Sequence, residues 1–385
     1  MRTTSATSPS RSSALLQLLS VLALLLGSGC DDDLPEATLI ERMRVLGSRF
    51  EVVGDETRAS PKPGERLHVS LATVFDTTAK NIEGVSSMVI QCTAPDQYTG
   101  GVPICQEFLD AARLSATAEV DPQLEDDVTQ LLDEGFVLSC GDLGDELFEF
   151  EGVSLRCLEG APETTIGIPG GFRANEALLL GVVCERGKAV LDPTLPTLMG
   201  CDDENTEGIH FSALIPVQHD PSVENQNPPL DALTLNIDGG QWERFERDEF
   251  PPEGDCSSSA PKSGYGLDLR PADPGDHAIR ISLRDDVREA LEEGRENMEV
   301  VIHATAGDME RRFTLFQDAD LDDPDPEVDD GDPDTIDKLI EWEPPSPALL
   351  NALEVAKTGM LVRFFVTLRD GRGGFDMASY ALCVY

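Results

Sequence analysis

The chain has nine cysteines, and their type and spacing give its clearest prediction of chemistry. Eight of them lie between positions 92 and 383, and no two are closer than 13 residues. A zinc site needs clustered ligands such as C-x2-C, so a cysteine metal site is not expected. An even number of separated cysteines instead predicts disulfides formed in an oxidising compartment. Of the 105 possible pairings of eight cysteines, we favour neighbour pairing: Cys92–Cys105, Cys140–Cys157, Cys184–Cys201 and Cys256–Cys383.

An acidic run over 318–337 is the second candidate for chemistry. Aspartates alternate at its start, and another stands at the twelfth position, as in a calcium-binding loop. The sixth position, which should be glycine, is Asp323, and two prolines stiffen the segment. A solvated acidic connection is therefore favoured over a calcium site. The candidate calcium ligands are Asp318, Asp320, Asp322 and Asp329.

The N-terminal segment has the organisation of a secretion signal. Arg2 and Arg11 precede a 13-residue apolar run, 14–26, and three small residues follow. The run is too short for a membrane-spanning helix, which needs about 20 residues. We therefore expect residues 1–29 to be a signal peptide.

Residues 26–30 resemble the lipobox of bacterial lipoproteins, which ends at a cysteine that is lipidated and becomes the mature N-terminus. The family has an apolar residue three places before the cysteine, where this chain has Gly27. The resemblance implies a lipid anchor on Cys30, an acidic tether over 30–38 and a place in the cell envelope; the alternative is ordinary signal cleavage nearby. Asp31 directly after the cysteine resembles an inner-membrane retention signal, a rule that varies between lineages, so the inner and outer membranes both stay open.

Composition excludes some partners and sets the size of the folded part. The formal net charge is −44, which repels nucleic acid phosphates, so no nucleic acid partner is expected. Hydrophobic residues make up 40% of the chain, enough to build packed cores. The length after a signal peptide fits two or three domains.

Short segments of alternating apolar residues, separated by turn residues, predict a mainly β chain. We expect two Ig-like β-sandwich domains, 39–220 and 221–385, which meet near Pro221, with the acidic loop 318–337 in the second. The expected strands cover 66–75, 85–92, 177–184, 210–217, 233–237, 265–269, 278–283, 300–303, 313–316 and 360–368.

The first domain is enlarged by an expected insertion at about 95–170. A short helix is expected inside it, from Asp121 and Pro122 to Gly135, and two of the proposed disulfides would staple it. A second short helix is expected over 285–293, ending at Gly294.

The segments 43–47, 63–65, 225–230 and 238–242 are rich in turn residues, and together they resemble uncharacterised lipoproteins common in myxobacteria. The closing segment Arg369–Gly374 also resembles the last hairpin turn of Ig-like and PKD-like modules, where glycine supplies positive φ. The resemblance covers most of the chain outside the insertion and implies a fold and an anchor, since that family has no assigned activity. Residues 304–307 and Trp342 also resemble the final strands of Ig-like and PKD-like modules.

No nucleotide-binding, nucleophile-elbow or metalloprotease motif occurs. Ser259 and Lys262 with Lys357–Gly359 match two penicillin-binding motifs, but Pro261 stands where the catalytic helix must begin. The sequence therefore predicts a non-catalytic binding, adhesion or structural module of the envelope, with no cofactor apart from the calcium option. Its partners would be the membrane, through the anchor, and an unknown envelope protein or glycan. The alternatives are an enzyme of unrecognised type in the first domain and a calcium-stabilised adhesion protein.

Overall fold

The structure is a computed structural model. All the residues that it describes belong to the unit Thr38–Tyr385, and in that part of the chain no helix is long and apolar enough to cross a membrane. The described residues are 39–40, 42–74, 85–94, 138–139, 147–150, 153–159, 163–192, 199–203, 205–220, 224–245, 256, 268–269, 276–291, 294–311, 313–322, 334–353 and 359–384.

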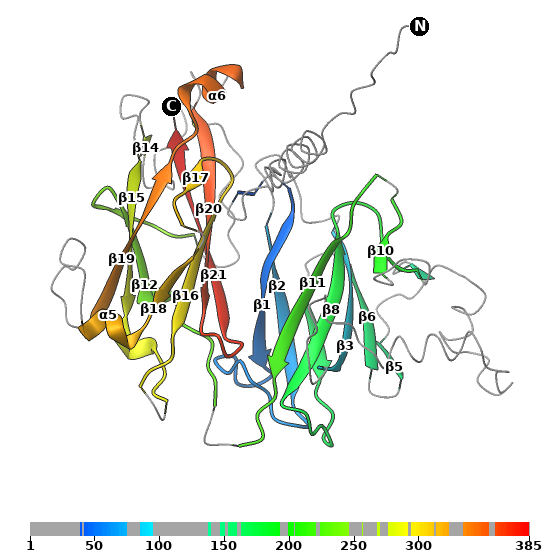
Figure 1. Cartoon of the computed structure of the whole chain (residues 1–385). Helices are drawn as coiled ribbons and strands as arrows, with labels where there is room; N and C mark the ends of the chain where they lie inside the picture. Colours follow the sequence, from blue (N-terminus) through cyan, green and yellow to red (C-terminus); the bar gives the residue numbers. More distant parts are fainter. Residues whose placement is uncertain are drawn as a thin grey trace, which may run out of the picture. The chain divides into compact units, whose positions relative to one another are not determined.

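The chain is mainly β, and its first half forms a β-sandwich (Figure 1). One sheet has the order β1-β2-β7, and the other has the order β11-β8-β3-β6-β5. Alternating side chains from both sheets fill one core, which includes Phe50, Leu67, Leu179 and Ile215. The strands are β1 (Arg44–Val52), β2 (Arg66–Val74), β3 (Ser86–Thr93), β5 (Leu147–Phe150), β6 (Val153–Glu159), β7 (Glu163–Gly167), β8 (Glu176–Cys184) and β11 (Ile209–Pro216).

A small third sheet covers the outer face of β8. It has the order β10-β9-β4, and the disulfide Cys184–Cys201 ties β10 to the end of β8. Strand β8 is therefore buried on both faces, which explains why its sequence is a continuous apolar run rather than an alternation. The strands of the small sheet are β4 (Leu138–Ser139), β9 (Ala189–Leu191) and β10 (Met199–Cys201).

A second sandwich follows, with sheet orders β13-β12-β15-β19-β17 and β14-β21-β20-β16-β18. In the described part of the chain, no sheet combines strands from both sides of residue 220. The strands are β12 (Leu233–Ile237), β13 (Gly240–Trp242), β14 (Asp268–Leu269), β15 (His277–Arg284), β16 (Met298–Ala304), β17 (Asp308–Met309), β18 (Thr314–Phe316), β19 (Thr335–Glu343), β20 (Met360–Arg369) and β21 (Phe375–Val384). The short helices are η2 (Leu230–Ala232), η3 (Asp285–Val287), α5 (Asp318–Asp322) and α6 (Pro347–Ala352).

Aromatic side chains organise the second core. Trp242 and Trp342 both contact Phe364 edge to face, with ring centroids 4.8 Å and 5.0 Å away. Each buried indole N–H donates to a backbone carbonyl, Trp242 to Ala381 and Trp342 to Ala306. The polar atoms of both tryptophans are thus satisfied, as burial requires.

Most of the expected strands are present within a residue or two of their predicted ends. The expected helix over 285–293 is wrong: η3 is a single turn, and Ala290 then pairs with Arg295 around Gly294, whose φ is +87°. Within the expected insertion, β6 and β7 join the sandwich sheets, and the helix expected from Asp121 to Gly135 lies outside the described residues. The expected acidic loop begins with α5 and ends inside β19.

Strand β1 contacts the second sandwich through a close approach at Gly47. A β-bulge lies between Val45 and Gly47, and a Cβ on Gly47 would lie 2.3 Å from the ring of Phe375 in β21. That ring is only 5% exposed, so it has little room to move. Glycine at position 47 is therefore what allows β1 and β21 to meet.

Replacing Gly47 with alanine should destabilise the fold by about 1–3 kcal/mol, because the added methyl group overlaps a buried ring. Gly167→Ala is the matched control, since Gly167 also lies in a strand and has open space around its Cβ position. Urea denaturation measures both variants. Equal stability of the two would contradict the close approach.

Candidate functional site

Residues 224–229, which connect the two sandwiches, pair with a loop of the first one. The Ala59 N–H donates to the Asn225 carbonyl at 2.9 Å, and the Asn227 N–H donates to the Thr57 carbonyl at 2.7 Å. The connection is thus hydrogen-bonded along its length. We call this segment, strand β1 and residues 369–376 together the junction.

The side-chain amide of Asn227 bridges the two sandwiches. Its Nδ2 donates to the Phe50 carbonyl in β1 at 2.6 Å, and its Oδ1 accepts from the Phe375 N–H in β21 at 3.2 Å. Asn227 is 7% exposed. One buried amide therefore satisfies a backbone acceptor of one sandwich and a backbone donor of the other.

The turn between β20 and β21 is built on Asp370. Its Oδ1 accepts from the backbone N–H groups of Arg372 at 2.7 Å and Gly374 at 2.8 Å. Asn225 Nδ2 donates to the Arg372 carbonyl at 3.1 Å, which ties the turn to the connection. Gly373 has a φ of +103°, a conformation that favours glycine. The hairpin turn predicted at the end of the sequence is confirmed.

Two arginines add charge-assisted bonds across the junction. Arg49 of β1 donates to the Phe375 carbonyl at 3.0 Å and forms an ion pair with Asp376 at 2.9 Å. In the opposite direction, Arg369 of β20 donates to the Leu46 carbonyl of β1. The bonds to Leu46 and Phe50 occupy carbonyls along the outer edge of β1.

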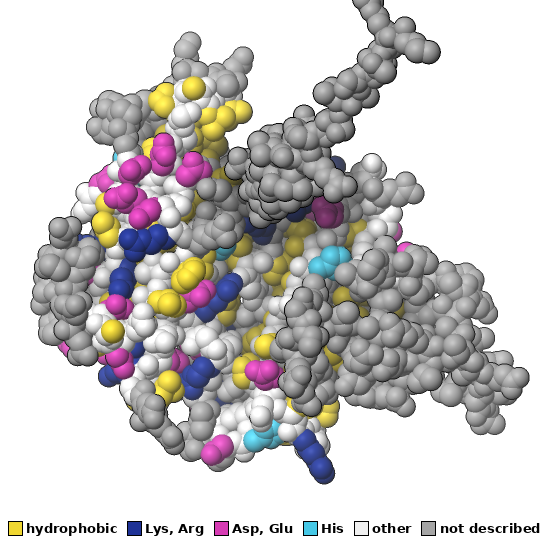
Figure 2. Space-filling model, in the orientation of Figure 1, with side chains coloured by type: hydrophobic (Ala, Val, Ile, Leu, Met, Phe, Trp, Pro, Cys, Tyr) yellow, Lys and Arg dark blue, Asp and Glu magenta, His cyan; other side chains and the backbone are white. Residues whose placement is uncertain are grey.

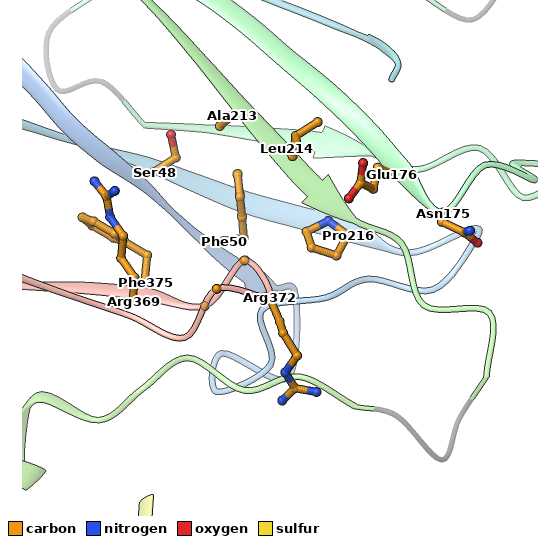
Figure 3. Close-up of a pocket in the computed structure, with 13 residues that line it drawn as sticks. Ser48, Phe50, Asn175, Glu176, Ala213, Leu214, Pro216, Arg369, Arg372 and Phe375 are labelled. Carbon is orange, nitrogen blue, oxygen red and sulfur yellow. The ribbon is translucent and has the colours of Figure 1, made fainter. Parts of the chain in front are cut away.

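A cleft of about 600 Å³ lies beside the junction. Phe50 and Leu214 line it from the first sandwich, from strands β1 and β11, and the turn residues 371–374 and Phe375 line it from the second (Figure 3). The Arg372 side chain leaves the turn on the side away from Phe50 and Leu214 (Figure 3). The cleft is therefore lined by apolar side chains, glycine backbone and a few polar groups.

The outer edge of β11 faces away from β8. The Val217 N–H donates to the Asn175 carbonyl, and the register continues without a shift along both strands. In an antiparallel pair, bonded residues alternate with unbonded ones, so the backbone groups of Ser212 and Leu214 point outward. Pro216, which has no N–H, occupies another outward position, as expected on an edge strand. In the described part of the chain, β11 pairs with β8 alone.

Four charged side chains meet behind the turn and form what we call the carboxylate cluster: Glu289, Glu296, Asp370 and Arg372. Arg372 Nη2 contacts Glu289 Oε2 and lies 3.0 Å from Glu296 Oε2. Glu289 Oε1 also accepts from the Gln226 N–H of the connection at 2.8 Å. Glu296 and Asp370 are each 3% exposed.

Burial shifts the protonation of this cluster. Burial raises the pKa of Glu296 to about 7, with a hydrogen bond from the Glu289 N–H opposing the rise and the charge of Asp370 adding to it. Burial also raises the pKa of Asp370, against the two backbone N–H groups that stabilise its ionised form. Sequence reasoning did not single out Glu289 or Glu296, because nothing in their spacing distinguishes them from the other carboxylates.

Two of the four expected disulfides, Cys184–Cys201 and Cys256–Cys383, are confirmed. Cys92 is also disulfide-bonded. Cys157 lies in β6, and its side chain is outside the described part of the chain. Cys30, Cys105 and Cys140 lie outside the described residues.

Two of the candidate calcium ligands form ion pairs with basic side chains. Asp318 binds the Arg288 guanidinium at 2.7 Å, and Asp320 forms an ion pair with Lys338. Asp322 ends α5, and Asp329 lies outside the described residues. Among the residues that the structure describes, no group of three or more His, Cys, Asp or Glu is placed to hold a metal.

Charges of both signs occur on the described surface. Figure 2 shows Lys and Arg side chains among the Asp and Glu side chains on the face drawn, although the net charge is −44. That face does not present a field of a single sign.

Comparisons with known proteins assign no family. No family model matches the chain, and no curated protein matches it. Among solved structures, the partial N-terminal region of Enterococcal surface protein aligns with 89% of this chain and 95% of its own, at 8% sequence identity and a TM-score of 0.21.

Removing the Asn227 amide should weaken the junction strongly. Asn227→Ala leaves the Phe50 carbonyl and the Phe375 N–H buried without a partner, and we expect a loss of about 2–4 kcal/mol in unfolding free energy. Gln241→Ala, which removes an exposed amide from β13, should cost under about 0.5 kcal/mol. Urea denaturation compares the two, and equal losses would contradict the bridging role.

Proposed function

We propose that this chain is a lipid-anchored protein of the bacterial cell envelope that acts as a non-catalytic binding module, and that the cleft takes an extended segment of a partner polypeptide. The anchor is the acylated Cys30, and the resemblance to myxobacterial lipoproteins belongs to the same proposal. The main support for the binding role is the cleft, because the edges of strands β1 and β11 form part of its wall.

The disulfides support a location outside the reducing cytosol. Cys184–Cys201 links neighbouring strands, and Cys256–Cys383 closes a separation of 127 residues. Such bonds persist in chains that fold in oxidising compartments.

Backbone geometry supports a polypeptide ligand. Leu214 lines the cleft and presents an outward donor and acceptor on β11, and Ser212 does so one outward position farther along the same edge. The outer edge of β1 faces the cleft at Ser48. A polypeptide in extended conformation offers complementary groups at the same spacing, the mode known as strand addition. The exposed Leu214, at 37%, offers an apolar contact for an alternate side chain of the ligand.

Ser212→Pro should abolish partner binding without unfolding the sheet. Proline removes only the outward N–H of residue 212 and is tolerated on edge strands. The matched control, Ser212→Ala, removes the hydroxyl and keeps the N–H, so it should bind like the parent. The measurement is crosslinking and affinity capture of the tagged, membrane-anchored protein from native envelopes, quantified for all three chains.

A partner that is retained by the parent and by Ser212→Ala, and reduced at least tenfold for Ser212→Pro, is the expected result. Equal retention by Ser212→Pro and Ser212→Ala would contradict strand addition and favour a glycan or another surface. Circular dichroism and urea denaturation establish that the proline variant keeps its fold.

The anchor has a separate test. Intact-mass analysis of the membrane-extracted protein should show a mature chain that begins at Cys30 and carries acyl groups, and Cys30→Ala should release the protein from the membrane. A parent chain without acyl groups would contradict the anchor.

A further inference from the structure

The carboxylate cluster holds more negative charge than it can balance. Glu289, Glu296 and Asp370 surround one guanidinium, that of Arg372. Glu289 and Glu296 both contact Arg372, Glu296 through Nη2 at 3.0 Å and Nε at 3.1 Å, so one guanidinium serves two carboxylates. Asp370 accepts from two backbone N–H groups. Of the two carboxylates that share Arg372, Glu296 is the more buried, with 3% of its side chain exposed against 24% for Glu289, so its ionisation adds the buried charge that one guanidinium cannot balance.

Other cations near the cluster have partners of their own. Arg288 donates to the Glu296 carbonyl through Nε, and its other nitrogens bind Asp285 and Asp318. Arg295 pairs with Asp285. Beside the connection, Arg58 pairs with Asp55 and Glu65, and Lys62 pairs with Glu224.

The cluster joins three parts of the molecule. Glu296 Oε1 accepts from the Glu289 N–H at 3.1 Å, Glu289 binds the connection through Gln226, and Arg372 belongs to the turn that lines the cleft. The charge state of Glu296 therefore acts on the connection and on one side of the cleft together.

We propose that Glu296 is a proton-dependent control of the junction: its protonated carboxyl lets Glu289 and Arg372 balance each other and holds the turn 370–374 closed, and its ionised carboxylate loosens that turn. This change in the mobility of the turn involves the junction alone. Only its effect on ligand binding rests on the proposed function.

The pH window follows from the direction of the shift. The pKa of Glu296 is raised from 4.5 to about 7 in the closed junction, so the closed form binds the proton more tightly than the open form. Its advantage is fully present below pH 4.5, is lost as the pH rises from 4.5 to about 7, and stays lost above that. Mild acid closes the turn, and neutral to alkaline pH loosens it.

Hydrogen exchange measured by mass spectrometry tests this on the whole chain. For peptides that contain residues 225–227 and 369–375, the exchange rate of the parent is divided by that of Glu296→Gln at the same pH, which cancels the intrinsic pH dependence of exchange. We expect this ratio to rise at least about tenfold between pH 5 and pH 8, since a one-proton linkage allows about tenfold per pH unit within the window.

Two further variants make the result specific. Glu310→Gln removes an exposed carboxylate that pairs with Arg311, so this variant should exchange like the parent at every pH. Glu289→Gln removes the carboxylate that competes with Glu296 for Arg372, so the rise in the exchange rate of this variant relative to Glu296→Gln should move to lower pH. A ratio that stays constant from pH 5 to pH 8, or an unmoved midpoint in Glu289→Gln, would overturn the proposal. Because no ligand is present in this experiment, either outcome is independent of whether the cleft binds a polypeptide.

Discussion

The buried amide of Asn227 is the interaction on which the junction depends. Its two ends satisfy a carbonyl of β1 and an N–H of β21 that no other strand reaches. Burying backbone groups without partners costs more than the bonds themselves contribute, so this amide is what allows both groups to be buried where the two edges meet. The close approach at Gly47, the position of the turn on Asp370 and the outline of the cleft all follow from that meeting.

The junction also requires that its buried carboxylates lie beside cations. A chain with a net charge of −44 has few cations to place beside buried carboxylates, and the junction uses Arg49 and Arg372 for this purpose. Where one guanidinium serves more than one carboxylate, protonation restores the balance. The small number of cations that leaves the chain strongly acidic therefore also makes the buried carboxylate cluster sensitive to pH.

Local pattern predicted the elements better than the site. Strands with alternating apolar residues, such as β15 and β16, were found because one face is buried. Strand β21 was not predicted because polar residues such as Asp376 and Ser379 interrupt its apolar run, and β1 was not predicted because the bulge at Gly47 breaks its alternation. Residues 225–230 and 369–374 were identified as turn-rich segments, but the hydrogen bond from Asn225 to the Arg372 carbonyl joins positions 147 residues apart. No local pattern encodes such a contact.

The most direct test of the junction is the amide exchange rate of Phe375, followed by NMR at constant pH in the parent and in Asn227→Ala. The Phe375 N–H points away from β20, and Asn227 is its acceptor. We expect slow exchange in the parent and at least about tenfold faster exchange in the variant, with the exchange rate of the Leu382 amide, farther along the same strand, unchanged. Equal exchange of Phe375 in the two proteins would contradict it.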